Sequence, residues 1–390
     1  MGWGLTLTFL RWGPQFKLHR SMFQTAFSRS NIKAFQPLQL HEARKAVRTL
    51  TSRPAEWENV TLLMATSIIF RIAFGQAVED ENSPYCRMAA AANTATTNGG
   101  VPGSTLVDLF PLAKYLPDWL HASPALRHAR RSREAICVVH EVPWAAAWKD
   151  IASGIAAPSF MKTHLERLWE AEKAGRTPEV TLADIKGATG AAFIAGGNTT
   201  WSTDLSVLLF LTKYPVEQAR LHAEIDALIP LSRLPVFEDQ SRLPSIANFI
   251  DEVLRLLPLN PLTIPHRSLA EDFYRGMRIP AGSVVFANAK AMGRDPKAYT
   301  DPERFDPTRY ERGEPPPPGN FGFGRRRCPG NGLAMASVWA FVATLLSVFE
   351  VRMVEGEDGR LLEPEVGLTV GLGGSVPAYL RVWPICADLR

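Results

Sequence analysis

Most of the chain carries the hydrophobic spacing of amphipathic helices. Apolar side chains recur every three or four positions in the stretches 38–52, 57–75 and 160–178, with polar side chains between them. A glycine-rich stretch over 93–104 and a proline-interrupted stretch over 106–120 break this pattern. The first half of the chain is therefore predicted to consist of helices joined by loops.

The longest helical pattern covers residues 181–215. Thr181 and Asp184 resemble the start of a capping box, and Lys213 followed by Pro215 marks the end. A helix of about 30 residues would be roughly 45 Å long, enough to cross a whole domain. An asparagine, an aspartate and many threonines interrupt its apolar positions, which argues against a membrane span.

The pattern changes after residue 243. A helix is predicted over 243–258, short β-type runs and turns follow over 262–295, and a proline-rich stretch reaches residue 320. The last helix, predicted over 332–350, is apolar almost all round and is therefore expected to be buried. The sequence has no internal repeat and no evident linker, so we predict one domain over residues 1–390, mainly α with minor β-structure.

Composition and charge argue against several classes of protein. The chain is 46% hydrophobic and 21% charged, which is typical of a globular protein. Its 43 basic and 39 acidic residues give a net charge of +4, too balanced to indicate a nucleic-acid partner. The four cysteines are widely spaced, which supports neither a disulfide framework nor a zinc site and makes a reducing compartment the default. No run reaches the roughly 18 apolar residues that span a bilayer, so no anchor is evident.

One of the cysteines, Cys328, lies in the stretch FGFGRRRCPGNG at 321–332. A lone cysteine is most often a buried structural residue. Here the preceding arginines and the N-terminal end of the next helix favour a thiolate. Gly324, Gly330 and Gly332 would allow a flat or bulky group to approach the backbone. A thiolate acts as a nucleophile or as a metal ligand, and no histidine base lies nearby in the sequence.

This stretch resembles the haem-binding signature of the cytochromes P-450, F-x-x-G-x-R-x-C-x-G, at every fixed position: Phe321, Gly324, Arg326, Cys328 and Gly330. The resemblance implies a helix-rich haem domain with small β-sheets, and haem b (iron protoporphyrin IX) as the cofactor. Cys328 would be the axial thiolate ligand of the iron, which favours O–O cleavage. Arg326 would pair with a haem propionate.

Three further residues resemble structural motifs of the same family. Glu252 and Arg255 lie three positions apart on one helix and match the E-x-x-R pair. Arg309 in FDPTRY matches the arginine of the P-x-R-[FY] motif, and Arg304 in PERF is a rival assignment. The resemblance implies that Glu252, Arg255 and Arg309 brace the cysteine loop and take no part in turnover.

Two more residues resemble propionate ligands of the family. His266 in IPHR follows the E-x-x-R helix, at the register of the strand whose His or Arg meets a propionate. An exposed loop histidine is the alternative interpretation. Near the N-terminus, FKLHR resembles the W-x-x-x-R helix, with Phe16 at the tryptophan position and Arg20 as the propionate ligand. The phenyl ring lacks the indole N–H, so one donor is lost.

The long helix contains AGGNTT at 195–200, which resembles the family pattern A-G-x-[DE]-T-T. Two mid-helix glycines cost about 1 kcal/mol each relative to alanine, and either close helix packing or a groove over the haem would explain them. In the family pattern, Thr199 donates to oxygen, and Asn198 stands where an acid passes protons. Asn198→Asp is therefore expected to raise the product formed per reductant consumed. The substrate-contact residues that the resemblance implies are Ala195, Leu262, Thr263, Ile264 and the stretch 369–372.

The resemblance implies a monooxygenase that inserts one oxygen atom from O2 into a hydrophobic small molecule, with electrons from an NADPH-dependent flavoprotein reductase. The sequence is most similar in texture to fungal microsomal members, which associate with the cytosolic face of the endoplasmic reticulum membrane. Compared with them, the chain is expected to lack the anchor, the first helix and part of the first sheet. Two alternatives stay open: a reductase-independent haem-thiolate isomerase or dehydratase, and a degenerate, non-catalytic haem-binding fragment.

Overall fold

The computed structural model describes residues 2–97, 107, 110–117, 119, 123–353, 360 and 386–389. The longer helices are α1 (Pro14–Ala26), α3 (Gln36–Ser52), α4 (Trp57–Phe74), α5 (Pro84–Thr97), α7 (Pro124–Ala152), α8 (Phe160–Lys173), α9 (Leu182–Lys213), α10 (Pro215–Leu228), α11 (Pro244–Leu256) and α13 (Asn331–Leu346). Short helices and 3₁₀ turns join them: α2 (Arg29–Ile32), α12 (Ala289–Met292), η1 (Trp3–Leu5), η2 (Leu7–Phe9), η3 (Lys33–Phe35), η4 (Pro54–Glu56), η5 (Pro111–Tyr115), η6 (Phe237–Arg242), η7 (Pro307–Tyr310) and η8 (Gly324–Arg326).

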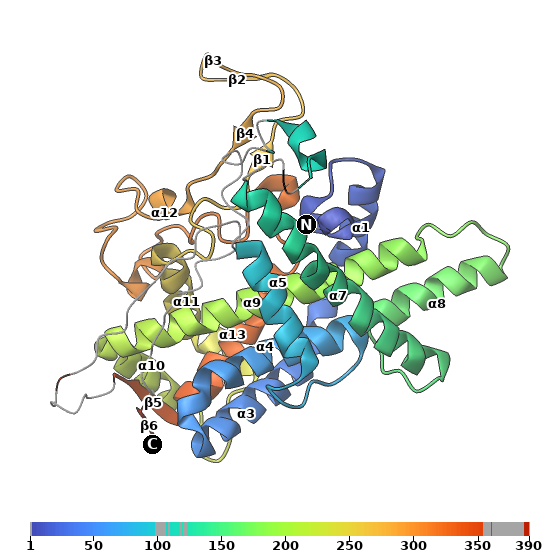
Figure 1. The fold of residues 1–390 in the computed structure, drawn as a ribbon. Coiled ribbons are helices and arrows are strands. Elements are labelled where there is room, and N and C mark those ends of the chain that lie inside the picture. Colours follow the sequence, from blue (N-terminus) through green and yellow to red (C-terminus); the bar gives the residue numbers. More distant parts are fainter. Residues whose placement is uncertain are drawn as a thin grey trace.

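Helix α9 runs through the middle of the molecule, and α4, α5, α7, α8 and α13 all pack against it (Figure 1). The prediction for this helix is confirmed at both ends. Thr181 and Asp184 form a reciprocal capping box, and the last helical residue is Lys213. Because neighbours cover α9 on most sides, its position fixes the positions of the helices around it.

Two apolar helices complete the core. Helix α13 is buried along most of its length, as predicted from its nearly uniform hydrophobicity. The segment Pro54–Phe74, which includes α4, has the length and composition of a membrane span, contrary to the prediction that no run in the chain does. However, 72% of the apolar window in this segment is buried inside the molecule. Its contacts with α3 and α9 account for its apolar character, so we interpret it as a core helix.

The minor β-structure forms antiparallel two-stranded sheets. β1 (His266–Arg267) pairs with β4 (Val284–Val285), β2 (Asp272–Tyr274) with β3 (Met277–Ile279), and β5 (Phe349–Arg352) with β6 (Cys386–Leu389). In the β2–β3 hairpin, Arg275 and Gly276 both have positive φ, 49° and 78°, as a type I′ turn requires. The β1–β4 pair and this hairpin lie at one end of the molecule, and β5 and β6 lie near the C-terminus (Figure 1).

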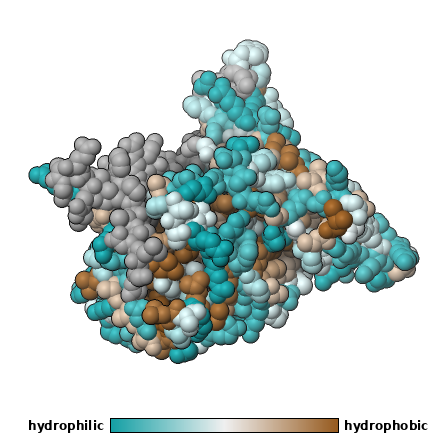
Figure 2. Space-filling model, turned by 90° about the horizontal axis from the view of Figure 1, so that it is seen from below, coloured by the Kyte–Doolittle hydropathy of each residue, from teal (hydrophilic) through white to brown (hydrophobic). Residues whose placement is uncertain are grey.

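The first residues of the chain pack against helices that are distant in sequence. Turns η1 and η2 both contact α9. Leu7 is buried, and the Thr6 hydroxyl lies 3.3 Å from Nε2 of His140 on α7. The face of the molecule in Figure 2 is largely hydrophilic with scattered apolar patches, as expected when the apolar stripes of helices are turned inward.

Candidate functional site

The Cys328 loop is a tight turn before helix α13. Gly322 and Gly324 have left-handed backbone conformations, with φ of 69° and 53°. The backbone N–H of Cys328 donates to the carbonyl of Phe321 at 2.7 Å, which closes the loop. A Cβ atom on Gly330 would lie 3.9 Å from the Cys328 sulfur, so backbone approaches the thiol closely. The Cys328 side chain is exposed, and this cysteine is therefore not a buried structural one.

The thiol is accessible, yet protein atoms crowd around it. Burial raises the pKa of the Cys328 thiol, and the Gly330 amide, Arg20 and Arg327 offset this effect only in part. The arginines thus favour the thiolate, as expected, but burial outweighs their effect in the cysteine alone. A metal ion deprotonates a thiol that coordinates it. Among the described residues, no cluster of three or more His, Cys, Asp or Glu could hold an ion.

Two arginines lie beside the cysteine loop, and neither forms an ion pair within the described part of the chain. Both Nη atoms of Arg326 lie 3.4 Å from the Leu10 carbonyl, and its Cζ lies 3.5 Å from the centroid of the Phe16 ring. The Nε–H of Arg20 is buried and donates to no partner among these residues. Burial lowers the pKa of both arginines, and the nearby charge of Arg20 lowers that of Arg326 further. Two close guanidinium groups are suited to bind carboxylates.

Helix α9 exposes Ala195 and Thr199 in its central part, one turn apart. The Thr199 hydroxyl donates to the Ala195 carbonyl at 2.6 Å. Asn198 is buried, and its Nδ2 donates to the carbonyl of Ala89 on α5 at 3.0 Å. Thr199 is therefore accessible, whereas the Asn198 amide ties two helices together.

The two glycines that follow Ala195 face helix α4. A Cβ atom on Gly196 would lie 2.4 Å from Cγ1 of Ile69, and one on Gly197 would lie 3.7 Å from Oγ1 of Thr66. Of the two explanations, the structure favours close packing between helices for Gly196, whereas no neighbour requires a glycine at position 197.

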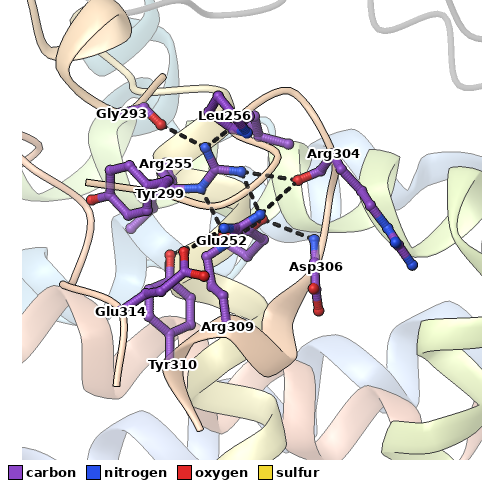
Figure 3. Close-up of polar contacts among 12 residues, drawn as sticks. Glu252, Arg255, Leu256, Gly293, Tyr299, Arg304, Asp306, Arg309, Tyr310 and Glu314 are labelled. Atoms are coloured by element: carbon purple, nitrogen blue, oxygen red, sulfur yellow. Dashed lines mark hydrogen bonds and ion pairs between the residues drawn. The ribbon is translucent and has the colours of Figure 1, made fainter. Parts of the chain in front are cut away.

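Glu252, Arg255 and Arg309 form a fully buried ion-pair network (Figure 3). Arg255 donates to both carboxylate oxygens of Glu252 at 2.8 Å, and Nε of Arg309 donates to Oε1 at 3.0 Å. The side chain of Arg304 points away from Glu252, and only its carbonyl takes part, accepting from both other arginines at 3.0 Å. The geometry thus gives the third position to Arg309.

Several members of these clusters were not predicted from the sequence. Glu314 accepts from Nη1 of Arg309 at 2.6 Å, and the Tyr310 hydroxyl donates to Glu252 at 3.1 Å. Tyr310 is the aromatic position of the P-x-R-[FY] motif, which was a usable signal. No signal in the sequence identifies the Leu10 carbonyl, because any residue type supplies one.

The remaining predicted residues lie around the β1–β4 pair. His266 pairs with Val285 and is exposed. Leu262 and Ile264 are 44% and 41% exposed, and Thr263 between them has a φ of 55°, which is rare for a β-branched residue. The propionate role of His266 and the substrate role of these three residues stay predictions. The stretch 369–372 lies outside the described residues.

The chemistry of these groups fits an iron porphyrin. An accessible thiol supplies one ligand for the metal, and the porphyrin itself brings four nitrogen ligands. Two arginines that lack acidic partners among the described residues match its two carboxylates. Phe323, an exposed apolar side chain in the cysteine loop itself, supplies surface for a largely apolar ring.

Comparison with known proteins gives one consistent result. The family model described as Cytochrome P450 matches residues 3–373. A cytochrome P450 monooxygenase of Armillaria gallica is 34% identical over 377 residues, which cover 95% of this chain and 73% of that protein. The tryptamine 4-monooxygenase of Psilocybe cyanescens is 32% identical over 384 residues, covering 95% and 74%. A zebra fish cytochrome P450 solved with abiraterone covers 99% of this chain and 85% of its own, with 21% identity and a TM-score of 0.75.

Proposed function

The chain belongs to the cytochrome P450 family, and from this premise we propose that Cys328 is the axial ligand of its haem iron. It is a cytochrome P450 monooxygenase with a haem cofactor, and its fold is the P450 fold. The observation that carries the proposal is an accessible cysteine, inside the matching motif, beside two arginines without acidic partners among the described residues.

The residues of the chain have separate tasks in this proposal. Cys328 binds the iron, and Arg326 and Arg20 bind the two carboxylates of the porphyrin. Phe321, Gly324 and Gly330 shape the loop that presents the sulfur. When bound, the haem supplies the oxidative chemistry with O2.

In this proposal, helix α9 and the segment before β1 would line the substrate side of the site. The accessible hydroxyl of Thr199 holds and transfers a proton, while the Asn198 amide keeps α5 in place. Ala195, Leu262 and Ile264 provide an apolar wall that excludes water and favours a hydrophobic substrate.

Members of this family generally take electrons from a separate reductase and act on hydrophobic substrates. For this chain we assign the reductase role to an NADPH-dependent flavoprotein, because the sequence has no dinucleotide fingerprint of its own. An intact Thr199 beside Ala195 favours a monooxygenase over a reductase-independent isomerase or dehydratase.

The carbon-monoxide difference spectrum of the reduced protein tests Cys328 directly. The chain, expressed with haem supplied, is expected to show the strongly red-shifted band of thiolate-ligated haem. Cys328→Ser should lose this band, whereas Cys137→Ser, at another cysteine that forms no disulfide, should retain it. A red-shifted band that survives in Cys328→Ser, or a band at the position of histidine-ligated haem in the unaltered chain, would contradict the proposal.

A further inference from the structure

The Arg326 guanidinium rests on an aromatic ring. Its Cζ lies 3.5 Å from the centroid of Phe16, which is only 3% exposed. Trp12 contacts the same ring at 5.5 Å between centroids. A buried, well-packed ring is a firm support, because it has few alternative orientations in a close-packed interior.

Few other contacts fix the position of the Arg326 side chain. Its hydrogen bonds to the Leu10 carbonyl are long, 3.4 Å from each Nη, and none of the described carboxylates pairs with it. Arg20 follows Phe16 by four residues on α1, so the two side chains share one face of the helix. The charges of Arg20 and Arg326 are close enough to affect each other, and they repel. Another contact must therefore hold Arg326 in this position, and the Phe16 ring, 3.5 Å from its Cζ, supplies one.

A cation is attracted to the face of an aromatic ring, most strongly where water is excluded. Phe16 has no N–H or O–H group, so it cannot donate to a carboxylate itself. Its ring can act only through the guanidinium that it supports. We propose that Phe16 is a positioning residue: its ring holds the planar fork of Arg326 beside Arg20, so that both arginines receive the two carboxylates of the haem. This inference rests on the proposed function.

The rate of haem release measures the positioning role of Phe16. Haem transfer from the holoprotein to excess apomyoglobin is expected to be about tenfold faster in Phe16→Leu, because the leucine fills space but has no ring face. Phe23→Leu is the matched control, since Phe23 is also buried on α1 but packs against Phe27 and Phe160. Phe23→Leu should leave the rate unchanged, and Phe16→Leu should keep the red-shifted carbon-monoxide band.

A double-mutant cycle isolates the pair. In an Arg326→Met background, Phe16→Leu is expected to cause no further acceleration, because the cation is already absent. Additive effects of the two substitutions would overturn the proposal, and so would equal acceleration by Phe16→Leu and Phe23→Leu.

A measurement without haem separates this inference from the proposed function. In the haem-free chain, the Nε–H proton of Arg326 should resonate upfield because of the Phe16 ring current, and Phe16→Leu should abolish that shift. Arg326→Lys identifies the resonance. Absence of the shift in the unaltered chain would refute the stack even if haem binds. If the shift is present but the red-shifted band never forms, the proposed function fails instead.

Discussion

Asp204 lies in the buried part of helix α9, where an ionised carboxylate is unfavourable because it is removed from water. It is fully buried, and neither carboxylate oxygen has a hydrogen-bond partner among the described residues. Burial raises the pKa of this carboxyl well above its ordinary value. The group is therefore proton-bound in the folded chain over a pH range where it is ionised in the unfolded chain.

The pH dependence of stability follows from this difference. Between the unfolded and folded pKa values of Asp204, the folded state binds the extra proton. The free energy of unfolding should therefore fall by about 1.4 kcal/mol for each pH unit as the pH rises through this window. Asp204→Asn removes the ionisation, so it should unfold at higher denaturant than the unaltered chain at pH 7 but not at pH 4. Glu179→Gln, at an exposed carboxyl, should show no such pH-dependent gain. Equal urea midpoints for Asp204→Asn and the unaltered chain at both pH values would contradict this account.

Among the elements, helix α9 shows what a sequence can predict. Its start depends on a capping box four residues long, and its end on Lys213 and Pro215, so both signals are local. The partners of its glycines are not local. Gly190 lies against His140 of α7, and Gly196 lies against Ile69 of α4. A glycine in a helical pattern indicates close approach, but only the tertiary structure shows what approaches.

The same limit applied to the candidate site. The cysteine motif and the E-x-x-R pair were recognisable because each is a short pattern of side chains. The contact between Arg326 and the Leu10 carbonyl joins residues 316 positions apart through a backbone atom. The arginines that lower the pKa of Cys328 are visible in the sequence, whereas the burial that raises it is not.

Two glycines of α9 give a matched test of helix packing. A Cβ atom on Gly190 would lie 2.0 Å from Nδ1 of the buried His140, so Gly190→Ala should lower the free energy of unfolding by about 1–3 kcal/mol. No atom lies closer than 3.7 Å to a Cβ atom on Gly197. Gly197→Ala should therefore raise stability by up to about 1 kcal/mol, the ordinary gain within a helix. Thermal unfolding of the two variants measures the contrast, and a stabilised Gly190→Ala would show that His140 does not pack as described.

At the scale of the whole molecule, the Glu252 network connects helix α11 to the long meander that follows β4. Arg255 donates to the carbonyls of Gly293, Pro302 and Arg304. Arg309 donates to the carbonyls of Thr300 and Arg304. The meander contains little regular structure, so these buried donors supply much of what fixes its path toward the Cys328 loop.

Removing the charge of Glu252 should therefore destabilise the entire fold. Glu252→Gln leaves Arg255 and Arg309 buried without a full counter-charge, which typically costs about 3–5 kcal/mol. This is a large share of the roughly 5–15 kcal/mol that holds a native protein together. Glu271→Gln removes the partner of Arg278 in an exposed ion pair of 2.6 Å, and should cost no more than about 1 kcal/mol. Urea unfolding of both variants gives the comparison. Equal losses would mean that the triad stabilises the fold no more than an exposed pair does, whereas the expected difference would show that the fold depends on the buried carboxylate of Glu252.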